Sequence, residues 1–273
     1  AISTEISAPD TTVSCDSDLS PMSLGMASVD SSCCVGLVNF SFTDRSVAGP
    51  CSGIQSIERF WLGEDLCGNI DSSIQMITII DTISPEITCA TLDSNYETDP
   101  GACDYTVQGD EFDPIFISDN CGVERVINDY NSTSTLAAEV FPLGSTTVLW
   151  TVTDQCGNVT TCSIVVEVID RENPAFVNCP VDTITVGNDF STCEGGVNWS
   201  VPAATDNCEV ASVTQYAGPT PGQILPVGSY DIGYEVVDGS GNVDTCAFVV
   251  EIIDVQEPII GCPQDVTIST DGG

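Results

Sequence analysis

Hydrophobic and polar residues alternate along much of the chain with a period of two, the spacing of a β-strand with one buried face. The clearest example runs through residues 148–152 and again through 164–168, where every second residue is Val, Ile or Trp. Between these segments, Asp154-Gln-Cys-Gly-Asn158 supplies residues that favour tight turns. This stretch therefore predicts two strands joined by a short turn.

The same stretch occurs three times. In each copy an aromatic residue precedes an Asp, a Gly-Asn pair follows, and a second Asp closes the copy. The closing aspartates are Asp81, Asp170 and Asp254. Their separations of about 89 and 84 residues predict a tandem array of modules, which we number one to three: 1–81, 82–170 and 171–254. Residues 255–273 repeat the opening of a module, and we expect them to be the first strand of a fourth in a longer chain.

No segment shows a convincing helical period, and each module contains several short strand patterns separated by turn residues. This organisation predicts an all-β protein built from antiparallel β-sandwich modules. The predicted joints are short and end in proline: Asp81–Pro85, Asp170–Pro174 and Asp254–Pro258. Because short, proline-containing joints are poor flexible spacers, we expect the modules to be arranged end to end as a rod.

The charge balance excludes several functions. The 273 residues include 41 acidic and 4 basic residues and no His, for a net charge of −37. Nucleic acid is excluded as a partner, because phosphate binding needs a basic surface. No apolar run is long enough for a transmembrane helix, so we expect no direct membrane insertion. Without His, the chain cannot form a Ser-His or Cys-His nucleophilic site, and we expect no enzymatic activity.

Fifteen cysteines in modules that lack His predict disulfides and an oxidising compartment. Zinc is the alternative, but the Cys-x2-Cys pairs typical of four-cysteine zinc sites are missing from the sequence. Modules two and three have a cysteine in the first and in the last strand, and module one lacks both. This joint absence predicts the pairs Cys89–Cys162 and Cys179–Cys246. Each would close a loop of about 70 residues and contribute roughly 4 kcal/mol in the chain-entropy model.

The other pairings follow from comparing the modules. Module three keeps Cys193 and Cys208 although Ser240 replaces the cysteine of the turn, which favours Cys193–Cys208. By analogy we predict Cys103–Cys121 in module two, with Cys121–Cys156 as the alternative, and Cys34–Cys67 in module one. The partners of four cysteines stay open, and so does a bond between modules: Cys15, Cys33, Cys51 and Cys156.

The order of these motifs resembles the hyalin repeat (HYR) family over nearly all of residues 82–254. The motifs are Cys-Pro, Asp-Asn-Cys, Pro-x-Gly-Ser, aromatic-x3-Asp-x2-Gly-Asn and Thr-Cys. Module one resembles a bacterial HYR-like variant through Arg59-Phe-Trp61 and Asp65-Leu-Cys-Gly-Asn69. The resemblance implies immunoglobulin-like modules with a role in extracellular adhesion or filament building rather than catalysis.

Long acidic arrays of such modules resemble the giant cell-surface adhesins of gliding and biofilm-forming Bacteroidetes. That resemblance implies a stiff extracellular rod at the cell surface, used for adhesion or gliding motility. Its partners would be the neighbouring repeats of the same chain and an unidentified surface, glycan or protein ligand. Two alternatives stay open: a spacer or carbohydrate-binding appendage of a secreted enzyme, and an extracellular matrix protein such as hyalin.

Calcium is the strongest candidate for a bound cofactor. In an immunoglobulin-like module, the Asp119-Asn120 loop and the Asp154 turn should lie at the end where the previous module attaches, close to Asp81. Carboxylate and amide oxygens are suitable Ca²⁺ ligands. The corresponding residues at the next joint are Asp170, Asp206, Asn207 and Asp238. The alternative is that these side chains only cap turns, which is the interpretation we favour for Asn158 and Asn242.

Aromatic residues are the remaining candidates for a binding surface. Trp61, Trp150 and Tyr234 occupy the same place in each repeat, on the apolar side of the strand pattern, so we expect them in the cores. Trp199 lies outside that pattern and is the candidate for a surface contact with a glycan.

Overall fold

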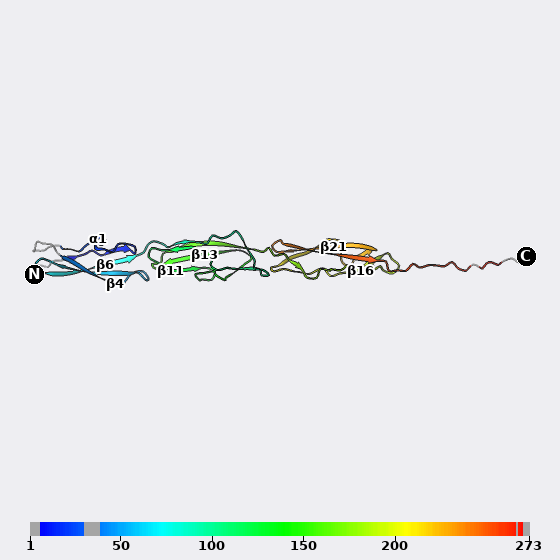
Figure 1. The fold of residues 1–273 in the computed structure, drawn as a ribbon, viewed down its shortest axis with the longest axis horizontal. Coiled ribbons are helices and arrows are strands. Elements are labelled where there is room, and N and C mark those ends of the chain that lie inside the picture. Colours follow the sequence, from blue (N-terminus) through cyan, green and yellow to red (C-terminus); the bar gives the residue numbers. More distant parts are fainter. Residues whose placement is uncertain (1–5, 30–38, 266, 270–273) are drawn as a thin grey trace. The chain divides into compact units, whose positions relative to one another are not determined.

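The computed structural model describes residues 6–29, 39–265 and 267–269 (Figure 1). It divides into two compact units. The first unit comprises Ala1–Tyr96 and Asp104–Val168, and the second comprises Glu97–Cys103 and Ile169–Gly273. Residues 97–103, which the sequence assigns to module two, therefore belong with the unit that contains module three.

Module one contains a four-stranded sheet, drawn in blue to cyan in Figure 1. Its strands, in spatial order, are β2 (Thr11–Ser14), β6 (Ile70–Ile80), β5 (Gln55–Glu64) and β4 (Asn39–Ala48). A second, smaller sheet pairs β1 (Ile6–Ser7) with β3 (Ser28–Val29), and the short helix α1 (Pro21–Leu24) precedes β3.

Module two has the same plan. Its larger sheet has the order β11 (Val123–Asn128), β13 (Gly144–Asp154), β14 (Val159–Ile169) and β8 (Tyr96–Glu97). Two short ribbons pair β7 (Glu86–Thr88) with β10 (Phe116–Ser118) and β9 (Asp104–Thr106) with β12 (Val140–Pro142). The hairpin of β13 and β14 is the repeated stretch of the sequence, and it places Trp150 opposite Cys162.

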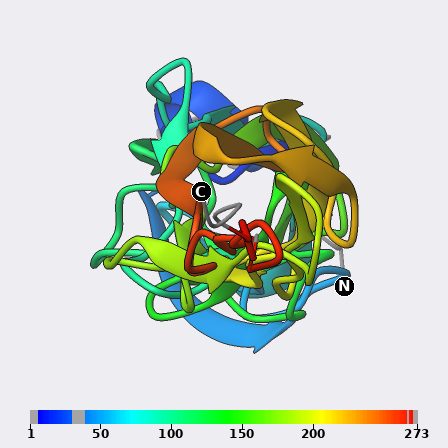
Figure 2. The ribbon, with the colours of Figure 1, turned by 90° about the vertical axis from the view of Figure 1, so that its right-hand side faces the viewer.

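Module three repeats this order, in yellow to orange in Figure 2. Its larger sheet contains β16 (Ile184–Gly187), β22 (Val243–Ile253), β21 (Gly228–Asp238) and β19 (Val210–Ala217). The short ribbons are β15 (Ala175–Phe176) with β18 (Ala204–Thr205) and β17 (Glu194–Gly196) with β20 (Ile224–Pro226). The protein is thus all-β and consists of tandem immunoglobulin-like β-sandwich modules.

The sheets depart from the predicted antiparallel pattern at one edge. The first segment of a module is split, so that β1 and β15 pair in the smaller sheet while β2 and β16 pair parallel with the last strands β6 and β22. Proline stands between the two halves, at Pro9 and at Pro180. Because proline lacks the N–H that a strand ladder needs, it favours this change of sheet.

The alternating residues of the long hairpins form the cores. Trp61, Trp150 and Tyr234 are at most 2% exposed, as expected. Trp199 is also buried, at 8% exposed, so the surface role expected for it is wrong. After β17 ends, every second residue is still buried, first Val197 and then Trp199. The Trp199 indole N–H donates a hydrogen bond of 3.1 Å to the Tyr234 hydroxyl.

Module one holds its core together without a disulfide between first and last strands. Ser73 stands opposite Trp61, at the place of Cys162 and Cys246 in the other modules. Two residues further on, the fully buried Gln75 accepts a hydrogen bond from the Trp61 indole at 3.1 Å and donates one to the Pro9 carbonyl at 2.8 Å. A buried amide therefore ties the first segment to the last strand in this module.

Candidate functional site

Among the described residues, two disulfides lie inside the modules, with the pairings that the repeats predicted. Cys89 is bonded to Cys162, and Cys179 is bonded to Cys246. In modules two and three these disulfides pack against the buried core that contains Trp150 or Tyr234. They connect the first segment of each module to its last strand.

In the part of the chain that the structure describes, three further disulfides connect residues of successive modules. They are Cys15–Cys121, Cys51–Cys156 and Cys103–Cys208, with sequence separations of 106, 105 and 105. The predicted pairs Cys103–Cys121 and Cys193–Cys208, and the alternative Cys121–Cys156, are therefore wrong. Cys34 lies outside the described residues, so the pair Cys34–Cys67 stays a prediction.

The reason for this difference is the position of Cys103. It belongs to segment 97–103, which packs with the second compact unit, so it lies beside Cys208 rather than beside Cys121. Cys193, the equivalent of Cys103 in module three, is a free and exposed thiol. In each of the three bonds the two cysteines are 105 or 106 residues apart in the sequence, which is more than the length of one module. This constant spacing is the sequence signal that could have revealed them.

Three aspartates from different segments of the first unit form a close group. Asp81 follows β6, Asp119 follows β10, and Asp154 ends β13. One carboxylate oxygen from each lies within 4.8 Å of the other two. Asp154 is 0% exposed and Asp81 is 6% exposed. The structure therefore brings together three of the four residues predicted for the first cation site.

The fourth residue, Asn120, also reaches this group. Its side-chain amide donates to Asp81 Oδ1 at 3.4 Å, and the backbone N–H of Ile83 donates to the same oxygen at 3.0 Å. Asp119 Oδ1 accepts two backbone N–H groups, from Cys121 at 2.8 Å and from Gly122 at 2.7 Å. In both aspartates, one oxygen shapes the local loop.

The other oxygen of each carboxylate has a different environment. Asp81 Oδ2 and Asp119 Oδ2 are buried, and neither has a hydrogen-bond partner among the described residues. Turn capping explains the first oxygen of each residue but not the second. A buried carboxylate oxygen with no partner is costly, because it has lost its hydration without replacement.

Asp154 is more fully hydrogen-bonded. Burial alone raises the pKa of this carboxyl, but donors from Asn158, Cys156 and Gly157 outweigh burial and hold its pKa below the ordinary value. Gly157 has φ of 89°, which lets the turn fold back so that the Asn158 amide donates to Asp154 Oδ2 at 2.7 Å. The same amide lies 3.2 Å from the Asp81 carbonyl oxygen. Asn158 thus caps its turn, as interpreted from the sequence, and also contacts the segment after β6.

The second unit contains a similar group. Asp170, which is 5% exposed, and Asp206 approach each other within 4.8 Å. Asp170 Oδ1 accepts from the backbone of Glu172 at 3.0 Å, and Asp206 Oδ2 accepts from the backbone of Cys208 at 2.8 Å. Three oxygens here are buried without a partner among the described residues: Asp170 Oδ2, Asp206 Oδ1 and Asn207 Oδ1.

Asp238 does not belong to this close group. Its carboxylate is occupied by the turn, because Ser240 and Asn242 donate to Oδ1 at 2.9 and 2.7 Å and the Asn242 amide donates to Oδ2 at 2.7 Å. Burial again raises the pKa of Asp238, and the hydrogen bonds from Asn242, Gly241 and Ser240 again lower it further than burial raises it. Asn242 also contacts the Asp170 carbonyl oxygen at 3.3 Å.

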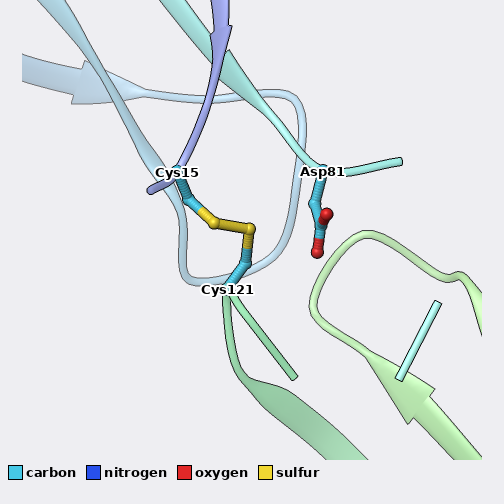
Figure 3. Close-up of side chains that lie close together, drawn as sticks. All are labelled: Cys15, Asp81 and Cys121. Carbon is cyan, nitrogen blue, oxygen red and sulfur yellow. A yellow bond between two sulfur atoms is a disulfide. The ribbon is translucent and has the colours of Figure 1, made fainter. Parts of the chain in front are cut away.

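Cysteine sulfur lies beside both groups. Figure 3 shows the Asp81 carboxylate next to the Cys15–Cys121 disulfide, and Cys208 lies close to Asp170 and Asp206. These sulfurs are bonded in disulfides and are not thiolates, so they cannot act as the soft ligands that zinc prefers. The ligands that both groups offer are oxygens.

Comparison with known families identifies the modules. Residues 80–168 and residues 169–252 each match the HYR domain model. The chain belongs to the HYR domain family. The matched residues include the Asp-Asn-Cys loops and the Asp-x2-Gly-Asn turns, which contribute to the acidic groups and to the bonds between modules.

Related HYR proteins include hyalins of sea urchins. The chain is 28% identical to hyalin of Strongylocentrotus purpuratus over 208 residues, covering 74% of this chain and 17% of that protein. It is 29% identical to hyalin of Lytechinus variegatus, covering 55% of this chain and 28% of the relative. A third relative, from Mus musculus, is the sushi, von Willebrand factor type A, EGF and pentraxin domain-containing protein 1, 37% identical over 92 residues, covering 33% of this chain and 2% of the relative. The chain therefore spans less than a third of the length of these relatives.

Similar solved structures include the insect immune protein hemolin and protocadherin gammaB7. Hemolin has a TM-score of 0.32 and 10% identity, covering 80% of this chain and 68% of that chain. The protocadherin fragment has a TM-score of 0.27 and 14% identity, covering 80% of this chain and 66% of that chain.

Among the described residues, no helix has the length and apolar character needed to cross a membrane.

Proposed function

We propose that this HYR chain is a load-bearing segment of an extracellular adhesion or matrix protein. The observation that carries the proposal is the set of three disulfides that bond residues of one module to residues of the next. Domains whose only task is to fold independently do not need covalent bonds across their joints. Such bonds suit a chain whose modules must keep their mutual orientation under force.

Other features support an extracellular, structural role. Ten cysteines of the described part of the chain are paired in disulfides, which persist in an oxidising compartment and are lost in a reducing one. The net charge of −37 would keep a concentrated surface array soluble by mutual repulsion. The hyalin relatives belong to the same family, and nothing in the repeated carboxylates marks out one catalytic pair.

The array of modules could serve either at a bacterial cell surface or in an extracellular matrix. The acidic composition and the motifs of module one favour a bacterial surface adhesin that serves attachment or gliding. The relatives compared above come from sea urchins and mouse, which favours matrix assembly as the alternative setting. Both settings require the same property of this segment, which is resistance to bending at the joints.

Small-angle X-ray scattering tests that property. The perturbed protein carries Ser in place of both cysteines of each bond between modules, and it retains Cys89–Cys162 and Cys179–Cys246 as controls for folding. We expect the oxidised wild type to give a narrow distribution of maximum dimensions and the variant a broader one, with unchanged circular dichroism. Identical distributions would contradict the proposal that these bonds set the stiffness.

Binding of the oxidised chain to a glycan array distinguishes a load-bearing segment from a carbohydrate-binding appendage. A carbohydrate-binding appendage should bind one glycan class at micromolar concentration, whereas a load-bearing segment should bind none. The burial of Trp61, Trp150, Trp199 and Tyr234 in the cores favours the second outcome, because these rings are not available as a binding platform.

A further inference from the structure

We propose that Asp81, Asp119 and Asp154 form a binding site for a calcium-sized divalent cation, and that Asp170, Asp206 and Asn207 form a second, weaker one. Each site lies where an Asp-Asn-Cys loop meets the segment that follows the last strand of the preceding module. The role of the cation would be to brace the joint beside the disulfide. The sites would exist whatever surface the chain adheres to.

The unpaired oxygens are the main argument. In both Asp81 and Asp119, Oδ1 is held by loop hydrogen bonds while Oδ2 is buried with no partner among the described residues. The same division recurs in the second unit, where Asp170 and Asp206 each use one oxygen and leave the other buried. A chance failure to pair would not repeat at equivalent positions of two modules. A cation ligated by these oxygens explains the repetition.

Charge gives the second argument. Three carboxylates within 4.8 Å repel one another strongly when buried, and the chain already carries a net charge of −37. The ion pairs found among the described residues involve other acids: Arg45–Glu58, Arg59–Asp44 and Arg171–Glu97. No described arginine therefore compensates the first site. One divalent cation would offset most of its charge.

The spacing and chemistry of the ligands select the cation. Ca²⁺ takes about six to eight oxygens at roughly 2.3–2.6 Å, so two of its ligands can be separated by up to about 5 Å. The oxygens of Asp81, Asp119 and Asp154 lie within 4.8 Å of one another, which fits a single ion between them with water completing the shell. Mg²⁺ binds at about 2.0–2.1 Å in a stricter octahedron, so this looser group should favour calcium.

The second site should bind less tightly than the first. It has two close carboxylates and one amide oxygen, because Asp238, unlike Asp154 in the first site, does not lie within the close group. Fewer negative ligands reduce the affinity for a divalent cation.

Calcium titration of the full oxidised chain, after treatment with chelator and at constant ionic strength, tests the proposal. By isothermal titration calorimetry we expect two binding events of unequal affinity, and much weaker binding of Mg²⁺. Asp81→Asn should abolish the tighter event and Asp170→Asn the weaker one. The matched control is Asp65→Asn, because Asp65 caps the same turn in module one through Asn69 and Cys67 but has no place in either acidic group.

Thermal denaturation of Asp81→Asn separates a cation ligand from a turn cap. If Asp81 is a ligand, the variant should melt at the same temperature as the wild type or higher in chelator, and lower than the wild type in calcium. A lower melting temperature by the same amount in both conditions would mean that Asp81 only caps the loop, and would overturn the proposal. The proposal would also be overturned if calcium binding to the wild type released no more heat than calcium binding to Asp81→Asn. Either result would leave the scattering test of stiffness unaffected.

Discussion

Removing the disulfide inside module three should destabilise that module by a predictable amount. The perturbation is the double replacement Cys179→Ala/Cys246→Ala. The bond closes a loop with a sequence separation of 67, for which the chain-entropy model gives about 4.4 kcal/mol at 25 °C. Cys246 is 1% exposed and packs in the core, so loss of its sulfur adds a small packing cost. We therefore expect a loss of about 4–5 kcal/mol in the free energy of unfolding.

The three tryptophans permit a measurement on one module at a time, because each predicted module contains one. In a background of Trp61→Phe and Trp150→Phe, the fluorescence of Trp199 reports on module three, where its indole donates to the Tyr234 hydroxyl. Guanidinium denaturation of the oxidised protein should then show the midpoint falling by about 1 M or more, since the slope for a small domain is a few kcal/mol per molar.

The matched control is Cys193→Ser, because Cys193 is a free, exposed thiol in the same module. Its midpoint should not move. A loss below about 1 kcal/mol in the double variant would refute the reasoning, since the closed loop would then restrict the unfolded module far less than the chain-entropy model requires. An equal loss in Cys193→Ser would attribute the effect to cysteine replacement rather than to the bond.

Two further predictions concern buried polar groups. Gln75→Leu should destabilise module one by about 1–3 kcal/mol, because the Trp61 indole N–H loses its acceptor. Thermal denaturation followed by Trp61 fluorescence measures this loss, and unchanged stability would show that water replaces the amide. Asp154 and Asp238 have pKa values below the ordinary 3.8, so the stability they contribute is fully present above about pH 3.8 and is lost as the pH falls through the lowered values. Asn replacement at both should flatten the loss of stability on acidification, measured by denaturation at pH values from about 5 to 2; an unaltered pH profile would contradict this assignment.

Much of each module could be predicted from the sequence, because its pattern is local and repeated. The alternation of apolar and polar residues around Trp150 predicted the hairpin, and the joint absence of two cysteines from module one predicted the disulfide Cys89–Cys162. The split of the first segment between two sheets was not predicted, since alternation gives the face of a strand but not its partner. Trp199 was misassigned because it follows a short strand, where three residues give too little alternation to define the inward face.

The bonds between modules could not be obtained by comparing one module with another. That comparison shows which cysteines are kept together but not how a loop of one module meets the next, and Cys103 pairs with Cys208 for that reason. The acidic residues of the candidate site were predictable, because Asp and Asn in turn motifs mark the ends of strands. Which carboxylate oxygen lacks a partner depends on loop geometry that the sequence does not contain.

The connectivity of the disulfides limits how far the chain can be stretched. Between Cys15 and Cys208 the shortest covalent route crosses to Cys121, follows the backbone to Cys103 and crosses again. Even with every strand unravelled, this route measures only about 70 Å, against about 650 Å for the backbone alone. A pull applied at Cys15 and Cys208 could therefore extend this part of the chain to about 70 Å at most, until the disulfides are reduced.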